Sequence, residues 1–362
     1  MKIKRGLMIV LAFVLVACLF AACAKPAAPA APAAEAPAAE APAAETPAAP
    51  ADEGQTYRIG ATIVVEGQDF WDSNIKGINS AVADLGGRCE VIVQSAQDDP
   101  NVQLQQIENF ITQGVDAIIC ASVDSEAILP AVTKCNQAGI PFIFNYRPVF
   151  STDTATVDYG VGMDLIASAG MMAQWLVDYA KENGTKLEVI EVMGALGDNH
   201  AIFCRDGFAK VADANPDYIT VVTQIPTDWD TTKALSGLET ALTANPNANV
   251  VYSHSDYFYA SITSALQQKG LFNPIGETPR MMQAIVGGTM DGVNAVEAGY
   301  IDVLLNCPTY EIGYQAVIDT VDILDGKIIT DGKTFAEIDG FLLTKDNFAE
   351  MASKTFGARA QG

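Results

Sequence analysis

Clusters of aromatic, amide, carboxylate and guanidinium side chains follow several apolar runs in this 362-residue sequence. Aromatic rings stack on the apolar faces of a small molecule, and planar amides, carboxylates and guanidinium groups form paired hydrogen bonds with its polar edge. The segments that carry these groups are GQDFW (67–71), SVDS (122–125), NYRP (145–148), GALGDNH (194–200), PTDWD (226–230), HSDYF (254–258), GGTMDG (287–292) and NCP (306–308). Together they indicate a site for a small polar solute.

The elements that must position these clusters alternate along the chain. Strand-like runs are expected at 57–65, 89–95, 116–122, 141–145, 187–194, 219–225, 249–255 and 281–288. Between them, apolar residues such as Ile75, Ile78 and Val82 recur at helical spacing, and Asp98-Asp99-Pro100 predicts a helix start. This alternation predicts an α/β fold with parallel sheets covered by helices on both faces, and eight or more strands suit two sheets. Solutes bind beyond the carboxyl ends of such strands, where the clusters occur.

Catalytic and metal-binding motifs do not appear in the sequence. His200 and His254 are its only histidines, and there is no Gly-x-Ser-x-Gly elbow, His-Glu-x-x-His helix or Gly-x-x-x-x-Gly-Lys phosphate loop. We therefore expect neither an enzyme nor a metal or other cofactor.

The N-terminal segment has the layout of an export signal. Three basic residues precede an apolar run from Leu7 to Ala22, which ends in small residues before Cys23. A plain transmembrane anchor is the alternative, although the run is short for one. We predict a signal peptide over 1–22 and lipidation at Cys23, with Cys18 as the alternative site. An Ala/Pro/Glu-rich linker then extends over 23–55 and is expected to be a disordered spacer.

Net charge and cysteine content restrict the kinds of partner and of covalent framework that the protein can have. The formal net charge of −23 argues against a nucleic-acid partner, which would require a basic face. About 300 residues after the linker suffice for two domains of ordinary size. Five cysteines remain there, without a Cys-x-x-Cys pair, so buried thiols are favoured over a disulfide framework. They are Cys89, Cys120, Cys135, Cys204 and Cys307.

An ordered set of segments resembles a known family. These segments are GQDFWDSNIKG (67–77), GVDAIICASVDSEAILPAV (114–132), AGIPFIFNYRP (138–148), PTDWDTTKALSGLETALTANPNANVVYSHSD (226–256) and AVEAGYIDVLLNCP (295–308). They are similar to the type I periplasmic sugar-binding proteins, which include the ribose- and glucose/galactose-binding proteins. The resemblance implies two Rossmann-like lobes joined by a three-crossing hinge, near 161–164, 305–307 and 338–341. Lobe 1 would comprise 56–162 plus 307–339, and lobe 2 would comprise 163–306 plus 340–362, with hinge closure around the solute.

The resemblance also implies which residues contact the solute. By position these are Gln68, Phe70, Trp71, Tyr146, Arg147, Trp229, Ser255, Asp256 and Asn306. Asp198, His200 and Arg205 are further candidates. Structural alternatives remain open: core packing for Phe70 and Trp71, an ion pair for Arg147, hinge capping for Asn306, and helix capping for Asp198.

Three positions depart from the family pattern in the second lobe. The family commonly has an arginine where this chain has Cys204, and Arg205 comes one residue later, which turns it by about 100° along a helix. An aspartate is replaced by Gly287, and an asparagine by Ser255. Fewer groups are therefore expected to read hydroxyls in this lobe.

The function implied by the resemblance is that of an extracytoplasmic receptor. It would capture a small polar solute, with a monosaccharide as the leading class, and deliver it as a lipid-anchored monomer to the permease subunits of an ABC importer. A receptor for a nucleoside or signalling solute, and a sensory subunit for a membrane kinase or chemoreceptor, are the alternatives. A LacI-type repressor shares the core fold, but an export signal stands here in place of its DNA-binding head.

Overall fold

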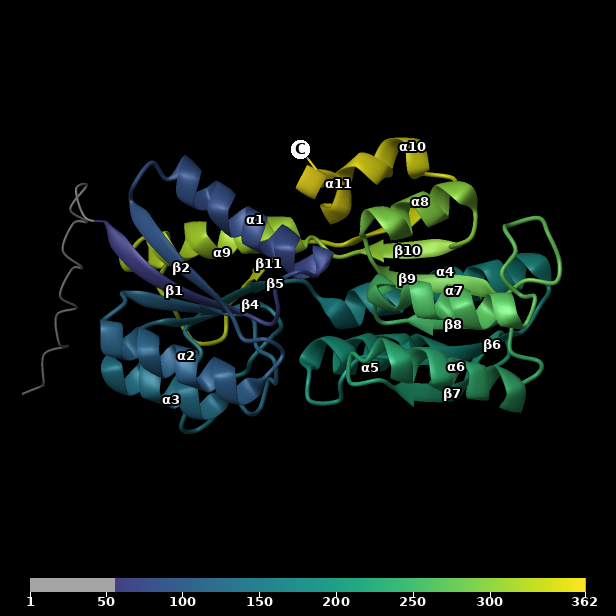
Figure 1. Cartoon of the computed structure of the whole chain (residues 1–362), viewed down its shortest axis with the longest axis horizontal. Coiled ribbons are helices and arrows are strands. Elements are labelled where there is room, and N and C mark those ends of the chain that lie inside the picture. The colour runs from purple at the N-terminus through teal and green to yellow at the C-terminus, as the bar shows by residue number, and fades with distance from the viewer. Residues whose placement is uncertain (1–55, 362) are drawn as a thin grey trace, which may run out of the picture. The chain divides into compact units, whose positions relative to one another are not determined.

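The computed structural model describes residues 56–361, which belong to one compact unit. The predicted signal peptide, the lipidation sites Cys18 and Cys23 and the predicted linker lie outside the described residues. Within 56–361 the chain forms two six-stranded sheets, each covered by helices (Figure 1). The predicted two-lobed α/β fold is confirmed.

The first sheet has the strand order β11-β5-β4-β3-β1-β2, and all its pairings are parallel. Its strands are β1 (Tyr57–Ile63), β2 (Cys89–Ser95), β3 (Ala117–Cys120), β4 (Phe142–Tyr146), β5 (Tyr159–Gly162) and β11 (Ala336–Glu337). Its helices are α1 (Asp69–Asp84), α2 (Pro100–Gln113), α3 (Leu129–Ala138) and α9 (Thr309–Leu324). Helices α1 and α9 share one face of the sheet, and α2 and α3 share the other.

The second sheet has the order β12-β10-β9-β8-β6-β7, in which only β12 runs antiparallel to its neighbour. Its strands are β6 (Leu187–Met193), β7 (Ile219–Pro226), β8 (Val250–Ser253), β9 (Met282–Gly287), β10 (Val303–Asn306) and β12 (Phe341–Thr344). Its helices are α4 (Leu165–Asn183), α5 (Asn199–Ala214), α6 (Thr231–Ala244), α7 (Tyr259–Gln268) and α8 (Met290–Ala298). A short 3-10 helix, η1 (Asp256–Phe258), precedes α7.

Local sequence signals explain where the helices begin. Asp99 caps α2 by accepting a hydrogen bond from the backbone N–H of Asn101, and Pro100 occupies the first turn, as predicted. Asp198 caps α5 in the same way through the N–H of His200. The eight predicted strand runs correspond to β1–β4 and β6–β9, whereas the short strands β5, β10, β11 and β12 were not predicted as strands.

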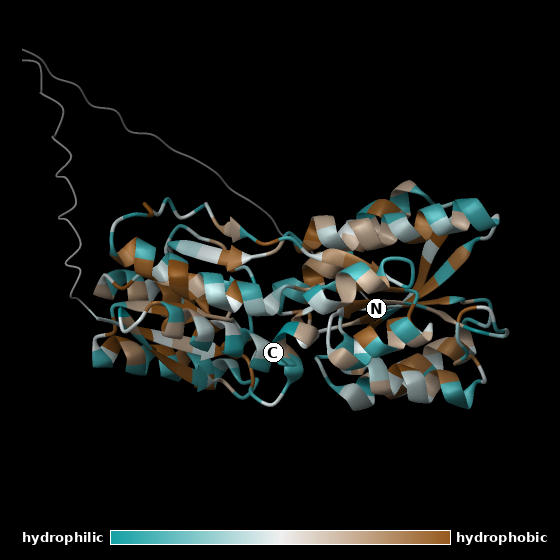
Figure 2. Cartoon of the chain, turned by 90° about the horizontal axis from the view of Figure 1, so that it is seen from above, coloured by the Kyte–Doolittle hydropathy of each residue, from teal (hydrophilic) through white to brown (hydrophobic). Residues whose placement is uncertain are grey.

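The chain passes between the sheets three times. These passages follow β5, β10 and β11, and the last one leads into β12. One buried cluster contains residues of both sheets together with Met163, Leu165 and Cys307 from the passages. Figure 2 shows hydrophobic residues concentrated on the strands between the helical layers. The apolar core therefore continues through the hinge. The exact residues at which one lobe ends and the other begins stay a prediction.

The C-terminal segment contacts both lobes. It continues from β12 through α10 (Phe348–Met351) and a second 3-10 helix, η2 (Ala352–Lys354), to α11 (Phe356–Gln361). Helix α11 packs against α1 and α9 of the first lobe and against α8 of the second. Sequence analysis assigned this tail to the second lobe alone.

The five described cysteines are buried and form no disulfide, so the prediction of buried thiols is confirmed. Burial raises the pKa of Cys135 and Cys307 to about 12. These thiols stay protonated near neutral pH and act as small apolar core groups.

Candidate functional site

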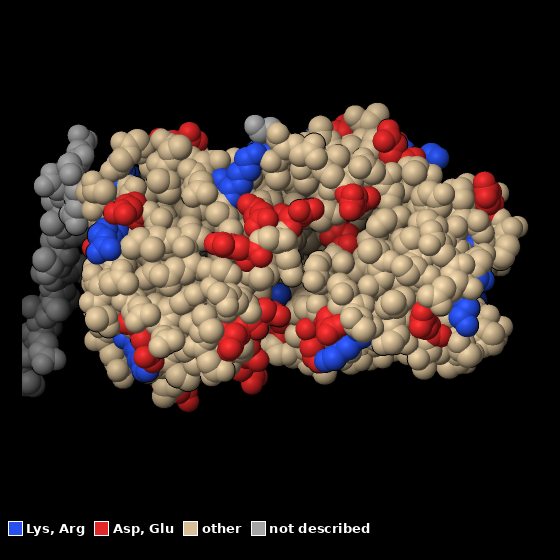
Figure 3. Space-filling model, in the orientation of Figure 1, with Lys and Arg blue, Asp and Glu red and all other residues tan. Residues whose placement is uncertain are grey.

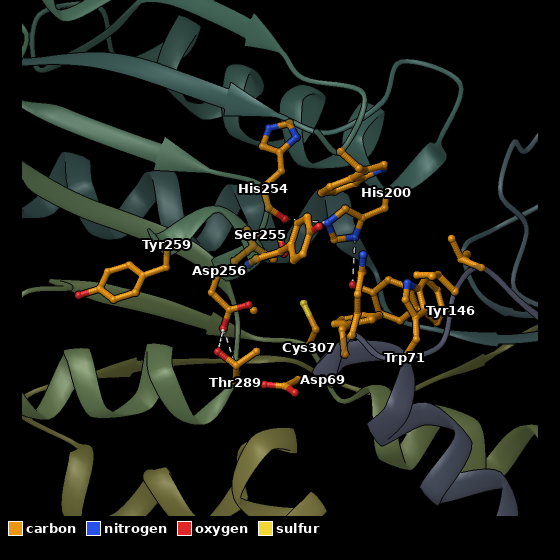
Figure 4. A pocket seen from close by; sticks show the side chains of 18 of the residues that line it. Asp69, Trp71, Tyr146, His200, His254, Ser255, Asp256, Tyr259, Thr289 and Cys307 are labelled. Atoms are coloured by element: carbon orange, nitrogen blue, oxygen red, sulfur yellow. Dashed lines mark hydrogen bonds between the residues drawn. The ribbon is translucent and has the colours of Figure 1, made fainter. Parts of the chain in front are cut away.

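A cavity of about 330 Å³ lies where segments following the strands of the two sheets meet. Its walls come from both lobes, as the close-up in Figure 4 shows. The lining residues are Val64, Val65, Gly67, Gln68, Asp69, Phe70, Trp71, Asp98, Tyr146, Arg147, His200, Trp229, His254, Ser255, Asp256, Tyr257, Tyr259, Ala260, Val286, Gly287, Thr289, Asp291 and Cys307. This position matches the rule that ligands of parallel sheets bind at the carboxyl ends of strands.

Aromatic rings form much of the wall. Phe70 and Trp71 belong to the first turn of α1, and each makes an edge-to-face contact with Tyr146, at centroid distances of 4.8 and 6.1 Å. Trp229, from the loop before α6, stacks on Phe258 with an interplanar angle of 10°. These side chains present fixed apolar surfaces from both lobes, which suits the C–H faces of a small ring-shaped solute.

A buried ion pair joins the lobes at the back of the cavity. Arg147 follows β4, and its Nη2 lies 2.8 Å from Oδ2 of Asp198, the cap of α5. Asp198 is fully buried, and the indole Nε1–H of Trp229 donates to the same oxygen at 3.1 Å. Burial raises the pKa of the Asp198 carboxyl, whereas Arg147 lowers it. The Asp198 carboxylate therefore orients both the Arg147 guanidinium and the Trp229 indole ring.

A second contact between the lobes passes through a neutral histidine. Tyr146 Oη lies 3.0 Å from His200 Nδ1, and His200 Nε2 lies 2.9 Å from the carbonyl oxygen of His254. Only Nε2–H can donate to that carbonyl, so Nδ1 accepts a hydrogen bond from the Tyr146 hydroxyl. Burial lowers the pKa of His200 to about 3. The imidazole thus acts as an uncharged bridge.

Asp256 takes the place of a side chain at position 287. Its Oδ2 accepts hydrogen bonds from the N–H groups of Gly288 and Thr289 and from Thr289 Oγ1, at 2.7–2.9 Å. A Cβ atom on Gly287 would lie 2.2 Å from Asp256 Cγ. The Asp256 carboxylate therefore occupies the space that a side chain at position 287 would need, which explains why glycine stands there.

Most of the predicted site residues line the cavity. The nine that do so are Gln68, Phe70, Trp71, Tyr146, Arg147, His200, Trp229, Ser255 and Asp256. Their direct contact with a solute stays a prediction.

Three predicted residues do not line the cavity, and each has a physical reason. Asp198 lies behind the wall, with both carboxylate oxygens occupied by protein donors. Cys204 of α5 is buried, and Arg205, one residue later, is turned by about 100° away from that direction. Its guanidinium instead pairs with the carboxylate of Asp206. Asn306 is buried, and its Oδ1 accepts the N–H of Phe356 at 3.1 Å. The hinge-capping alternative therefore describes Asn306.

Sequence analysis missed several wall residues. Asp69, Thr289, Asp291 and Cys307 all belong to post-strand segments that the sequence pattern had singled out, so the signal that could have found them was their position after a strand. Asp98 was assigned only to a helix start, and its φ of 57° places it in a left-handed turn beside the cavity. Tyr259 lies in the first turn of α7.

Over residues 56–361, no group of three or more His, Cys, Asp or Glu side chains is placed to hold a metal ion. Within the same residues, no helix combines the length and apolar character needed to cross a membrane.

Comparison with known proteins decides the family. A family model described as a periplasmic binding protein domain matches residues 59–328. The chain belongs to this family. Membership places the domain of this periplasmic binding protein outside the cytoplasm, and its relatives are binding proteins, not enzymes.

Individual relatives of this periplasmic binding protein agree with that assignment. It is 29% identical over 223 residues to the ribose import binding protein of Bacillus subtilis, covering 61% of this chain and 70% of that protein. It is 27% identical over 272 residues to the xylitol-binding protein of Mycolicibacterium smegmatis, covering 72% and 71% of the two chains. Among solved structures, it resembles an ABC transporter solute-binding protein of Bacillus halodurans with bound myo-inositol. That match has a TM-score of 0.72 and 25% identity, and it covers 84% of this chain and 99% of the other.

Proposed function

We propose that this protein is the solute-binding receptor of an ABC importer and captures a monosaccharide or related polyol between its lobes. The observation that carries the proposal is the cavity of about 330 Å³ with aromatic walls from both lobes, Phe70 and Trp71 on one side and Trp229 on the other. A pyranose or cyclitol has two apolar faces and a rim of hydroxyls, so it fits between rings while polar groups bind its edge.

The relatives support the same class of solute. The names or descriptions of three similar proteins mention ribose, xylitol and bound myo-inositol. A solute that contacts both walls favours the closed arrangement of the lobes. This closed, solute-bound form is the one that a permease would recognise. We further propose that Cys23, with Cys18 as the alternative, carries the lipid that retains a monomeric receptor at the membrane. Attachment by more than one acyl chain would make it lasting.

A ligand-dependent stability measurement tests the proposed function. The exported domain, residues 56–362, would be unfolded and refolded to remove carried-over solute, and its thermal midpoint measured with pentoses, hexoses, inositols, nucleosides and amino acids. A solute at about 100 times its Kd adds roughly 2.7 kcal/mol, which raises the midpoint by several degrees. A shift with a sugar or cyclitol supports the proposal. A shift with a nucleoside or an amino acid alone would replace the solute class.

Transport and sensing are separated by a second measurement. Deletion of the gene should abolish uptake of the radiolabelled solute if the receptor serves an importer. Normal uptake with a lost transcriptional or chemotactic response would instead support the sensory alternative.

A further inference from the structure

The cavity wall carries far more negative than positive charge. Four carboxylates line it, from Asp69, Asp98, Asp256 and Asp291, whereas Arg147 is the only lysine or arginine. Arg147 is already neutralised by Asp198 at 2.8 Å. Across residues 56–361, the salt bridges include none of the four wall carboxylates. Figure 3 shows carboxylates gathered around the hollow between the two halves of the domain.

Two of these carboxylates approach the same part of the cavity from different lobes. Asp69 is the first residue of α1, and Asp256 begins η1 of the second lobe; Figure 4 shows both beside Thr289. Asp256 is only 7% exposed. Its Oδ2 is occupied by three donors, whereas no hydrogen bond within the described residues reaches its Oδ1. Burial raises the pKa of Asp256, and the negative charge of Asp69 adds to this shift.

The two carboxylates oppose closure unless something positive lies near them. Asp69 is exposed and Asp256 is buried, so the two like charges from opposite lobes meet where water is only partly excluded and Coulomb repulsion is stronger than in bulk water. A sugar hydroxyl can donate to one carboxylate but leaves the net charge unchanged. A protonated amine donates up to three charge-assisted hydrogen bonds and removes the repulsion, while nearby aromatic rings also attract a cation.

We infer that the solute carries a protonated amine, as in an amino sugar or aminocyclitol, and that this amine lies between Asp69 and Asp256. The inference rests on the proposed function and specifies the solute class for the same cavity. The aromatic walls hold the ring of the solute, as for a neutral sugar. Arg147 lines the same cavity, but its charge is compensated by Asp198 behind the wall, so the pair contributes no net charge.

The test compares solutes that share one ring and differ in a single substituent, which is a hydroxyl, an amine or an N-acetyl group. Calorimetric titration would use refolded domain with glucose, glucosamine and N-acetylglucosamine; galactose, galactosamine and N-acetylgalactosamine; and myo-inositol with an amino-inositol. The expected result is at least about tenfold tighter binding of one amine than of both its hydroxyl and its N-acetyl counterpart. Equal or weaker binding of the amines would overturn the inference while leaving the sugar-receptor function intact. Binding of a neutral sugar only with added Ca²⁺, and not with EDTA, would overturn it as well.

A variant pair locates the amine. Asp69→Asn removes one wall carboxylate, and we expect it to reduce the preference for the amine by about tenfold while the domain stays folded. Glu66→Gln is the matched control, because Glu66 is exposed in the same loop but does not line the cavity. Equal losses in both variants would indicate a general electrostatic effect and overturn the assigned position. If no sugar, cyclitol or amine binds, the proposed function fails, and the inference fails with it.

Discussion

Arg147 and Asp198, from different lobes, form an ion pair of 2.8 Å in which both side chains are almost completely buried. The guanidinium also lies 5.2 Å from the Trp71 ring centroid and 5.7 Å from that of Trp229, so it contacts aromatic walls of both lobes. The two lobes are therefore linked by a charge pair that is complete without solute. A solute binds beside this pair and need not neutralise it.

Breaking this pair should weaken both folding and closure. Asp198→Asn leaves the Arg147 guanidinium buried without its counter-charge, and we expect the free energy of unfolding to fall by about 3–5 kcal/mol. Denaturant unfolding measures this loss, and small-angle scattering should show a larger radius of gyration. Asp302→Asn is the control, because Asp302 pairs with Arg280 at 2.8 Å within the second lobe. The control should lose stability without opening, and an unchanged radius in both variants would contradict the prediction.

Trp229 should be the most sensitive aromatic residue for solute binding. Trp229→Ala removes a wall ring together with the indole donor to Asp198, and we expect affinity to fall by at least about 1.5–3 kcal/mol, that is, more than tenfold. Trp229→Phe retains the stacking surface and should lose less. Calorimetric titration with the identified solute gives both values. Trp175→Ala, which removes a ring stacked on Tyr179 in α4, should bind solute as the parent does. Equal affinity of Trp229→Ala and parent would exclude the aromatic clamp.

The neutral His200 bridge predicts a pH dependence of stability. Burial lowers the pKa of His200 from 6.5 to about 3 in the folded protein. Between these values the unfolded chain binds the proton and the folded protein does not, so the free energy of unfolding falls as pH falls. The contribution of one such group reaches about 1.4 kcal/mol per pH unit. Unfolding of the parent and of His200→Gln would be compared at intervals from pH 8 to pH 4. The parent should lose stability more steeply below 6.5, and parallel curves would contradict the prediction.

The C-terminal helix should hold the lobes together through Phe356. This side chain is fully buried, and its ring centroid lies 5.5 Å from that of Phe70 on α1. Phe356→Ala should lower the free energy of unfolding by about 3–5 kcal/mol through the cavity it creates. Phe335→Ala, at a position that is 38% exposed, should cost less than about 1 kcal/mol. Denaturant unfolding compares the two variants.

A second measurement on these variants tests the link between the lobes. Loss of Phe356 removes the packing of α11 on α1, so solute affinity should also fall, whereas Phe335→Ala should bind as the parent does. Unchanged affinity together with the expected loss of stability would make α11 a structural element only.

Much of the fold could be predicted from local patterns. Parallel strands were expected from β-branched runs such as 116–122, and the cap at Asp99 was expected from Asp-Asp-Pro, because both depend on neighbours a few residues apart. Strands β5, β10, β11 and β12 span two to four residues each and were not predicted, although β3 and β8 are equally short. The C-terminal tail was assigned to the second lobe from the family resemblance, whereas α11 also packs against α1 and α9 of the first lobe.

The sequence by itself determined the two-sheet architecture and the set of post-strand segments in which the site lies. Only the tertiary structure decided which side chains in those segments meet. It paired Arg147 with Asp198, engaged Asn306 with the backbone of Phe356, and placed the Asp256 carboxylate where a side chain at Gly287 would be. The physical reason is range: strand and helix periodicity follows from adjacent residues, whereas these contacts join residues 31 to 51 positions apart and depend on how separate elements pack.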